Sequence, residues 1–138
     1  MPLIKIPMKL ELFEELPLID RTDSAPVIRE KNGDLYLSYR SAREPHAFAV
    51  VCFRNCKAHF LGWPPASEIS SHPLFVEGLQ PFQVHVFRHG QDPWRWIITM
   101  SQCTLDLEAE AVEILAEENF ADNSKLALDF ELEKRYNN

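Results

Sequence analysis

The side chains best suited to chemistry in this 138-residue chain are its three cysteines and five histidines. Their closest grouping is Cys52-x3-Cys56-x2-His59, with His72 further along the chain. Zinc binds about four thiolate or imidazole ligands in a tetrahedral array, so these residues are candidates for a zinc site. Structural zinc ligands usually occur in C-x2-C knuckles, however, and the chain has none. On an extended strand His59 and Cys56 also point to opposite faces. We therefore expect no metal and no cofactor, and the zinc site is the less favoured alternative.

The segment Ser70-Ser71-His72 contains the residue types of a hydroxyl nucleophile and its base. Such a site needs the base within hydrogen-bonding reach and a third group that orients it. The chain has no G-x-S-x-G turn, and adjacent side chains on an extended segment diverge. We therefore expect Ser71 and His72 to bond loop backbone groups, while Pro73 begins a turn.

The remaining polar patterns indicate no chemistry. His85 and His89 would be neighbours on a helix, but residues 82–87 have a strand pattern, which separates the two by about 13 Å. The glutamates after residue 107 are typical of a solvated helical face rather than of a general acid in an apolar pocket. The four glycines form no phosphate-binding loop.

Length and composition are those of one globular domain covering residues 1–138. Apolar residues make up 46% of the chain and charged residues 25%. The formal net charge is −7, which argues against binding nucleic acid by neutralising phosphates. Residues 1–103 hold 11 acidic and 11 basic side chains, whereas residues 104–138 hold 10 and 3 and contain no glycine or proline. The last quarter is therefore a distinct acidic segment.

Three features predict a cytoplasmic protein that does not enter a membrane. Lysines, a glutamate and two prolines interrupt residues 1–16, which leaves no apolar core of signal-peptide length. No run of about 18 consecutive apolar residues occurs anywhere. The cysteines are few and odd in number, which disfavours a disulfide framework.

The segments that must position any site are mainly β-hairpins. Asn32-Gly33 tolerates positive φ at two positions, so residues 27–30 and 35–39 are predicted to form a hairpin with a type I′ turn. Residues 47–53 and 56–61 predict a second hairpin, interrupted at Arg54-Asn55. Residues 82–88 and 94–100 predict two more strands, joined by residues 89–93, and residues 64–81 form a long irregular loop of a kind that is often functional.

The acidic segment is harder to assign. Alanine, glutamate and leucine favour a helix over residues 107–118, although alternating apolar residues make a strand over 104–109 the alternative. Residues 126–132 fit a helix and a strand equally well. We expect an α+β fold in which a hairpin-built antiparallel sheet forms a small sandwich or half-open barrel, with helix toward the C-terminus.

Part of the chain resembles a group of small uncharacterised bacterial proteins. The matching segments are the strands GDLYLSYR and FAVVCFRNCKAHFLG, residues 94–103, and an S-x-H-P-L-[FY]-x-x-G-L motif at residues 70–79. Where the group usually has Asn-Asp-Glu, this chain has Ala66-Ser67-Glu68, and its acidic segment has no counterpart in the pattern. The resemblance covers about half of the chain and implies no activity.

For function, the sequence favours a non-catalytic binding or protein-interaction module that uses the loop at 62–79. The candidate binding residues are Trp63, Glu68, Ser71, His72, Phe75 and Trp96. In a second interpretation the tryptophans fill a small β core. The acidic segment would either cover the sheet or meet a partner protein with a basic surface, and by analogy an antitoxin-like or immunity-type role suits such a chain. The alternative is a small hydrolytic or zinc-assisted enzyme built on Cys52, Cys56, His59 and His72. The oligomeric state stays open.

Overall fold

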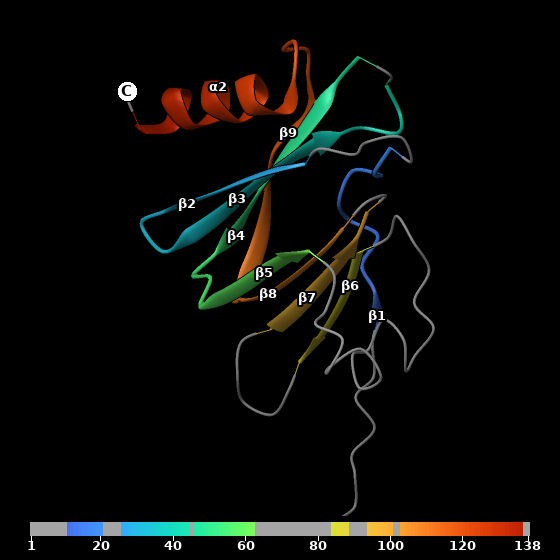
Figure 1. The fold of residues 1–138 in the computed structure, drawn as a ribbon, viewed down its shortest axis with the longest axis vertical. Coiled ribbons are helices and arrows are strands. Elements are labelled where there is room, and N and C mark those ends of the chain that lie inside the picture. Colours follow the sequence, from blue (N-terminus) through green and yellow to red (C-terminus); the bar gives the residue numbers. More distant parts are fainter. Residues whose placement is uncertain are drawn as a thin grey trace, which may run out of the picture.

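The computed structural model describes residues 11–20, 26–44, 46–62, 84–88, 94–100 and 103–136 (Figure 1). These residues form strands and one helix: β1 Glu11–Leu12, β2 Val27–Lys31, β3 Asp34–Arg40, β4 Phe48–Arg54, β5 Ala58–Gly62, β6 Val84–Arg88, β7 Trp94–Thr99, β8 Thr104–Ala109, β9 Ala111–Asn119 and α2 Ser124–Tyr136. Within these ranges, no helix has both the length and the apolar character needed to cross a membrane.

The strands form two antiparallel sheets. One has five strands in the order β1-β6-β7-β8-β5, and the other has four in the order β2-β3-β4-β9. Helix α2 covers the side of the four-stranded sheet that faces away from the five-stranded sheet (Figure 1). The α+β class, the antiparallel sheets and the C-terminal helix are as predicted.

The main core lies between the two sheets, and a smaller one lies under α2. Because side chains alternate across a strand, β3 and β4 contribute to both cores, and every residue from 35 to 39 and from 48 to 53 is buried. The main core includes Leu37, Tyr39, Val51, Phe53, Trp96, Ile98, Leu105 and Leu107. The core under α2 consists of Tyr36, Phe48, Val50, Cys52, Ala127, Leu128 and Leu132.

The first predicted hairpin is confirmed. Strands β2 and β3 pair from Val27↔Ser38 to Lys31↔Asp34, which leaves Asn32 and Gly33 as the turn. The φ angles of these two residues are 54° and 83°, so both are positive, as a type I′ turn requires. The two further predicted strands are present as β6 and β7, and they pair antiparallel with each other.

The second predicted hairpin is wrong, although both of its strands exist. Strand β4 pairs with β3 and β9, whereas β5 pairs with β8 in the other sheet. The chain therefore crosses from one sheet to the other between β4 and β5 and again between β8 and β9. These two crossings lie side by side, at Arg54–Ala58 and at Glu110, and both segments bend there. At this bend Asn55 alone has a positive φ, of 52°, whereas a type I′ hairpin turn requires two such residues. We call this bend the corner.

The helix predicted over residues 107–118 is also wrong, because β8 and β9 occupy this range. Leu105, Leu107 and Ala109 are buried between the sheets, and Asp106 and Glu108 point away. Pairing with β5, β7 and β4 outweighs the intrinsic helix preference of alanine and glutamate. The strand alternative for residues 104–109 is the one that the structure adopts.

Residues 126–132, which the sequence leaves open, are helical. Asn123 caps the helix, because its Oδ1 accepts a hydrogen bond of 2.9 Å from the backbone N–H of Leu126. Lys134 and Arg135 in the last turn complement the helix dipole. The alternating apolar residues of this segment fall on opposite sides of the helix: Leu128 and Leu132 are buried, whereas Leu126 and Phe130 are exposed.

Candidate functional site

Most of the binding residues predicted from the sequence lie outside the described residues: Trp63, Glu68, Ser71, His72 and Phe75. Trp96 is described and is buried in the main core. Its ring makes edge contacts with Phe13 and Phe53, at centroid distances of 5.1 and 5.5 Å. Its Nε1–H donates a hydrogen bond of 3.2 Å to the carbonyl of Ala109. Trp96 therefore fills the β core and presents no surface to a partner.

The described cysteine and histidine candidates do not converge. Cys52 is buried in the core under α2, whereas Cys56 packs against the main core on the other side of the sheet. His59 Nδ1 lies 3.2 Å from Glu30 Oε1, and His72 is outside the described residues. Among the residues that the structure describes, no three histidine, cysteine or acidic side chains are grouped as metal ligands would be.

The two thiols on either side of this sheet have raised pKa values. Burial raises the pKa of Cys52 to about 11, so this thiol is protonated at neutral pH. Burial also raises the pKa of Cys56. Because the thiolate is the nucleophilic and metal-binding form, both environments oppose cysteine chemistry.

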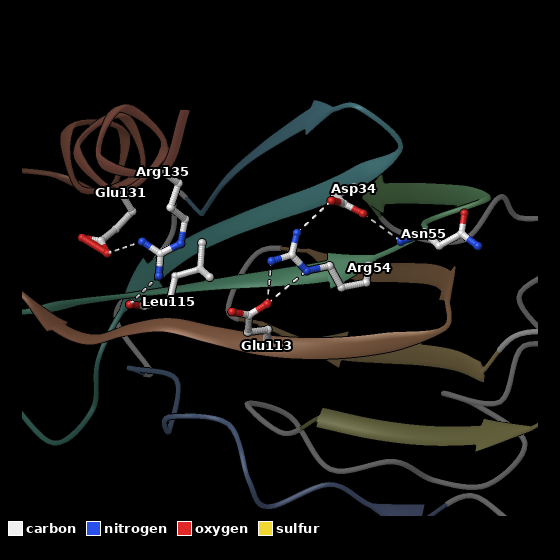
Figure 2. A network of polar contacts seen from close by, with 7 residues as sticks. All are labelled: Asp34, Arg54, Asn55, Glu113, Leu115, Glu131 and Arg135. Atoms are coloured by element: carbon white, nitrogen blue, oxygen red, sulfur yellow. Dashed lines mark hydrogen bonds and ion pairs between the residues drawn. The ribbon is translucent and has the colours of Figure 1, made fainter. Parts of the chain in front are cut away.

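A polar network surrounds Arg54 at the corner (Figure 2). Its Nη1 lies 2.9 Å from Asp34 Oδ2, and its Nε donates a hydrogen bond of 3.0 Å to Glu113 Oε2. The other carboxylate oxygen of Asp34 accepts a bond of 2.9 Å from the N–H of Asn55. The N–H of Cys56 donates to the carbonyl of Gly33 at 2.7 Å. These bonds join the first hairpin to the bend in β4–β5, which makes the network a structural fastening.

A different surface lies between β9 and α2, where a hollow has a volume of about 620 Å³. We call it the groove. Its apolar lining residues are Leu115, Ala116, Phe120, Ala121, Leu126 and Phe130. Phe120 is 64% exposed, Phe130 56% and Leu126 44%. Large apolar side chains grouped on a surface mark interaction sites more often than isolated ones do.

Irregular pairing of β9 creates this lining. The register between β4 and β9 shifts between Val51 and Val50 and again between Val50 and Phe48. Each shift adds a residue to β9, and such bulges bend the strand. As a result Leu115 and Ala116, which are neighbours in sequence, both pack against the core under α2. The groove is thus a consequence of the bent strand and the helix that returns over it.

Polar contacts join α2 to β9 beside the groove, and Figure 2 shows those of Arg135 with Glu131 and Leu115. Glu131 is buried, and its carboxylate accepts a hydrogen bond of 3.4 Å from Asn119 Nδ2 and pairs with Arg135 Nη1 at 3.5 Å. Arg135 Nη2 also donates to the carbonyl of Leu115 at 3.4 Å. These contacts hold β9 and α2 at a defined separation, and they engage the polar groups of Glu131 and Arg135.

The β9 border of the groove contributes one lining carboxylate, Glu118, and belongs to an acidic stretch of the chain. From residue 110 to residue 124 the sequence has five carboxylates and no lysine or arginine: Glu110, Glu113, Glu117, Glu118 and Asp122. Glu113 is paired with Arg54 at the corner. Glu117 and Glu118 are exposed. On the helix side the lining includes one cation, Lys134. A basic partner would complement this border.

Comparison of the chain with protein-family models, curated proteins and solved structures found no match. The groove was not predicted from the sequence, because the period-two pattern of residues 126–132 was compatible with a strand. One signal was present: with Asn123 as the helix cap, Leu126 and Phe130 fall opposite Leu128 and Leu132. A helix with two apolar sides has one side left for another surface.

Proposed function

We propose that this protein is a non-catalytic protein-interaction module that binds a basic and apolar segment of a partner protein in the groove. The supporting observation is the combination of three exposed large apolar side chains, Phe120, Leu126 and Phe130, with the exposed carboxylate of Glu118 in the same lining. Apolar contact supplies affinity in such sites, and complementary charge supplies selectivity and a faster association rate.

Two properties of the groove support binding rather than catalysis. Its buried carboxylate, Glu131, is engaged by Asn119 and Arg135, which suits a fixed floor more than proton transfer to a substrate. The thiol of Cys52 lies under the helix and not in the groove. By analogy, an immunity-type protein that covers a basic partner would use a surface of this kind.

The proposal can be tested with two fluorescent amphipathic peptides that have leucine at the same positions. All other positions are lysine in one peptide and glutamate in the other. We expect the lysine peptide to bind at least about tenfold more tightly, measured by fluorescence anisotropy, and its binding to weaken with added salt. The substitution Phe130→Ser removes an exposed apolar side chain without changing charge. It should weaken binding of the lysine peptide by about tenfold.

Leu18→Ser is the matched control, because Leu18 is 62% exposed and lies outside the groove. This variant should bind the lysine peptide as the unmodified protein does. Equal binding of the two peptides, or equal losses from Leu18→Ser and Phe130→Ser, would contradict the proposal.

A further inference from the structure

The open edge of β9 is poorly suited to accept an added strand. Among the described strands, β9 is at the end of the order β2-β3-β4-β9, so it has one neighbour. Addition of a strand needs a regular row of backbone donors and acceptors. The two register shifts between Ile114 and Asn119 interrupt this regularity along the part of β9 that lines the groove. Bulges at an edge are a known means of preventing strand pairing.

Side chains further occupy this edge. The guanidinium of Arg135 donates to the carbonyl of Leu115, inside the bulged region (Figure 2). Just beyond the end of β9, the backbone N–H of Ala121 donates a bond of 2.9 Å to Asn119 Oδ1. An incoming strand would therefore have to displace bonds that the protein already makes.

The helix side of the groove has the opposite character. Leu126 and Phe130 are four residues apart on α2, so their side chains lie in one row along the helix. Such i, i+4 rows are the ridges that pack into the grooves of a second helix. Phe120, at the end of β9, contributes to the same lining. The residues of α2 that line the groove run from Leu126 to Lys134, a contact line of about 12 Å that two to three turns of a partner helix would match.

Charge determines what kind of helix fits. Glu118 lies on the β9 border and Glu117 is exposed beside it, whereas Lys134 lies near the C-terminal end of α2. A second copy of this chain would bring the same glutamates and the same net charge of −7 to the interface, and these repel each other. A helix with lysine or arginine on the flank that faces β9 would be attracted instead.

We infer that the segment bound in the groove is an amphipathic basic α-helix that packs along the exposed Leu126–Phe130 row of α2. This inference rests on the proposed function and specifies the conformation of the partner. Recognition then depends on apolar side chains that recur at helical spacing, with no backbone pairing to β9.

The test uses two labelled peptides of identical leucine and lysine composition and length. In one, leucine recurs at i, i+3, i+4 and i+7, and in the other leucine and lysine strictly alternate, which favours a strand. We expect the full-length protein to bind the helix-patterned peptide at least about tenfold more tightly in fluorescence anisotropy. Circular dichroism of the complex should show added helix.

The possible failures are distinguishable. Tighter binding of the alternating peptide, weakened by Phe130→Ser, would overturn the helix inference but leave the proposed groove function in place. Binding of both peptides that is unaffected by Phe130→Ser and by Leu126→Ser would contradict the proposed function itself. Sedimentation equilibrium should give a monomer. A dimer that Phe130→Ser dissociates would make a second copy the occupant and overturn the inference.

Discussion

The corner and the groove each contain an arginine–glutamate pair, yet the two pairs have different surroundings. At the corner, Arg54 joins Glu113 to Asp34 on the face of β4 that also carries the fully covered Cys52. At the groove, Glu131, which pairs with Arg135, lines the same hollow as Phe120 and Phe130, and both phenylalanines remain exposed. An ion pair alone therefore does not indicate function. The state of the apolar side chains around it separates a structural fastening from a binding surface.

The strongest test of this contrast is Asp34→Ala at the corner. Asp34 accepts bonds from both Arg54 and the backbone of Asn55, and its side chain is 18% exposed. Losing these bonds should lower the free energy of unfolding by about 2 kcal/mol, measured by urea denaturation. Peptide binding in the groove should be unchanged.

Glu113→Ala is the control for Asp34→Ala, because Glu113 pairs with the same arginine but has a side chain that is 51% exposed. Solvent screens such a pair, so this variant should lose less than about 1 kcal/mol. A larger loss for Glu113→Ala than for Asp34→Ala would show that the corner depends on surface charge and not on the fastening of the hairpin turn.

Gly33→Ala tests the same fastening through the backbone. Gly33 has a φ of 83°, and a Cβ added there would meet no atom within 4 Å. The cost is therefore conformational alone, and we expect a loss of about 1 kcal/mol in unfolding free energy. Gly33→Asn should cost less, since asparagine tolerates this conformation. An unchanged stability for Gly33→Ala would mean that the turn relaxes freely and does not hold the corner.

A smaller effect is expected at Asp129, which attaches one wall of the groove to β2. Hydrogen bonds from Arg29, at 2.5 Å, and from Lys125, at 3.1 Å, hold the pKa of Asp129 below its ordinary value of 3.8. Because the folded pKa is the lower one, the stabilisation is complete above pH 3.8 and is lost as the pH falls through the folded pKa. Its size should be below about 1 kcal/mol, as for other exposed pairs.

Urea denaturation at pH 7 and pH 3 checks this prediction. The stability difference between the unmodified protein and Asp129→Asn should be larger at pH 7 than at pH 3. The same difference at both pH values would show that the carboxylate charge of Asp129 does not hold α2 in place.

The smallest stability effect should come from the groove itself. Phe120 is 64% exposed, so Phe120→Ser should change the unfolding free energy by less than about 0.5 kcal/mol. The same substitution should weaken the binding of the lysine peptide. A loss above about 1 kcal/mol, without a change in peptide affinity, would assign Phe120 to the fold and remove the distinction between the two regions.

Local signals in the sequence were sufficient for some elements and not for others. Asn32-Gly33 defines its own turn, so the first hairpin could be predicted from a few residues. The helical preference of residues 107–118 was local as well, but the pairing of β9 with β4 is not, and the distant contact determined the structure. The groove combines both, since it needs the bulges of β9 together with the position of α2. No local pattern contains that information.

The pairing of β4 with β9 also bears on the synthesis of this protein. Arg54 and Glu113 are separated by 59 residues, so at typical elongation rates β4 is made about 3 to 12 seconds before its partner. During this interval one edge of β4, the most apolar of the described strands, lacks its neighbour. Nascent chains that stall before residue 111 should therefore be the form most dependent on chaperones and most prone to aggregate.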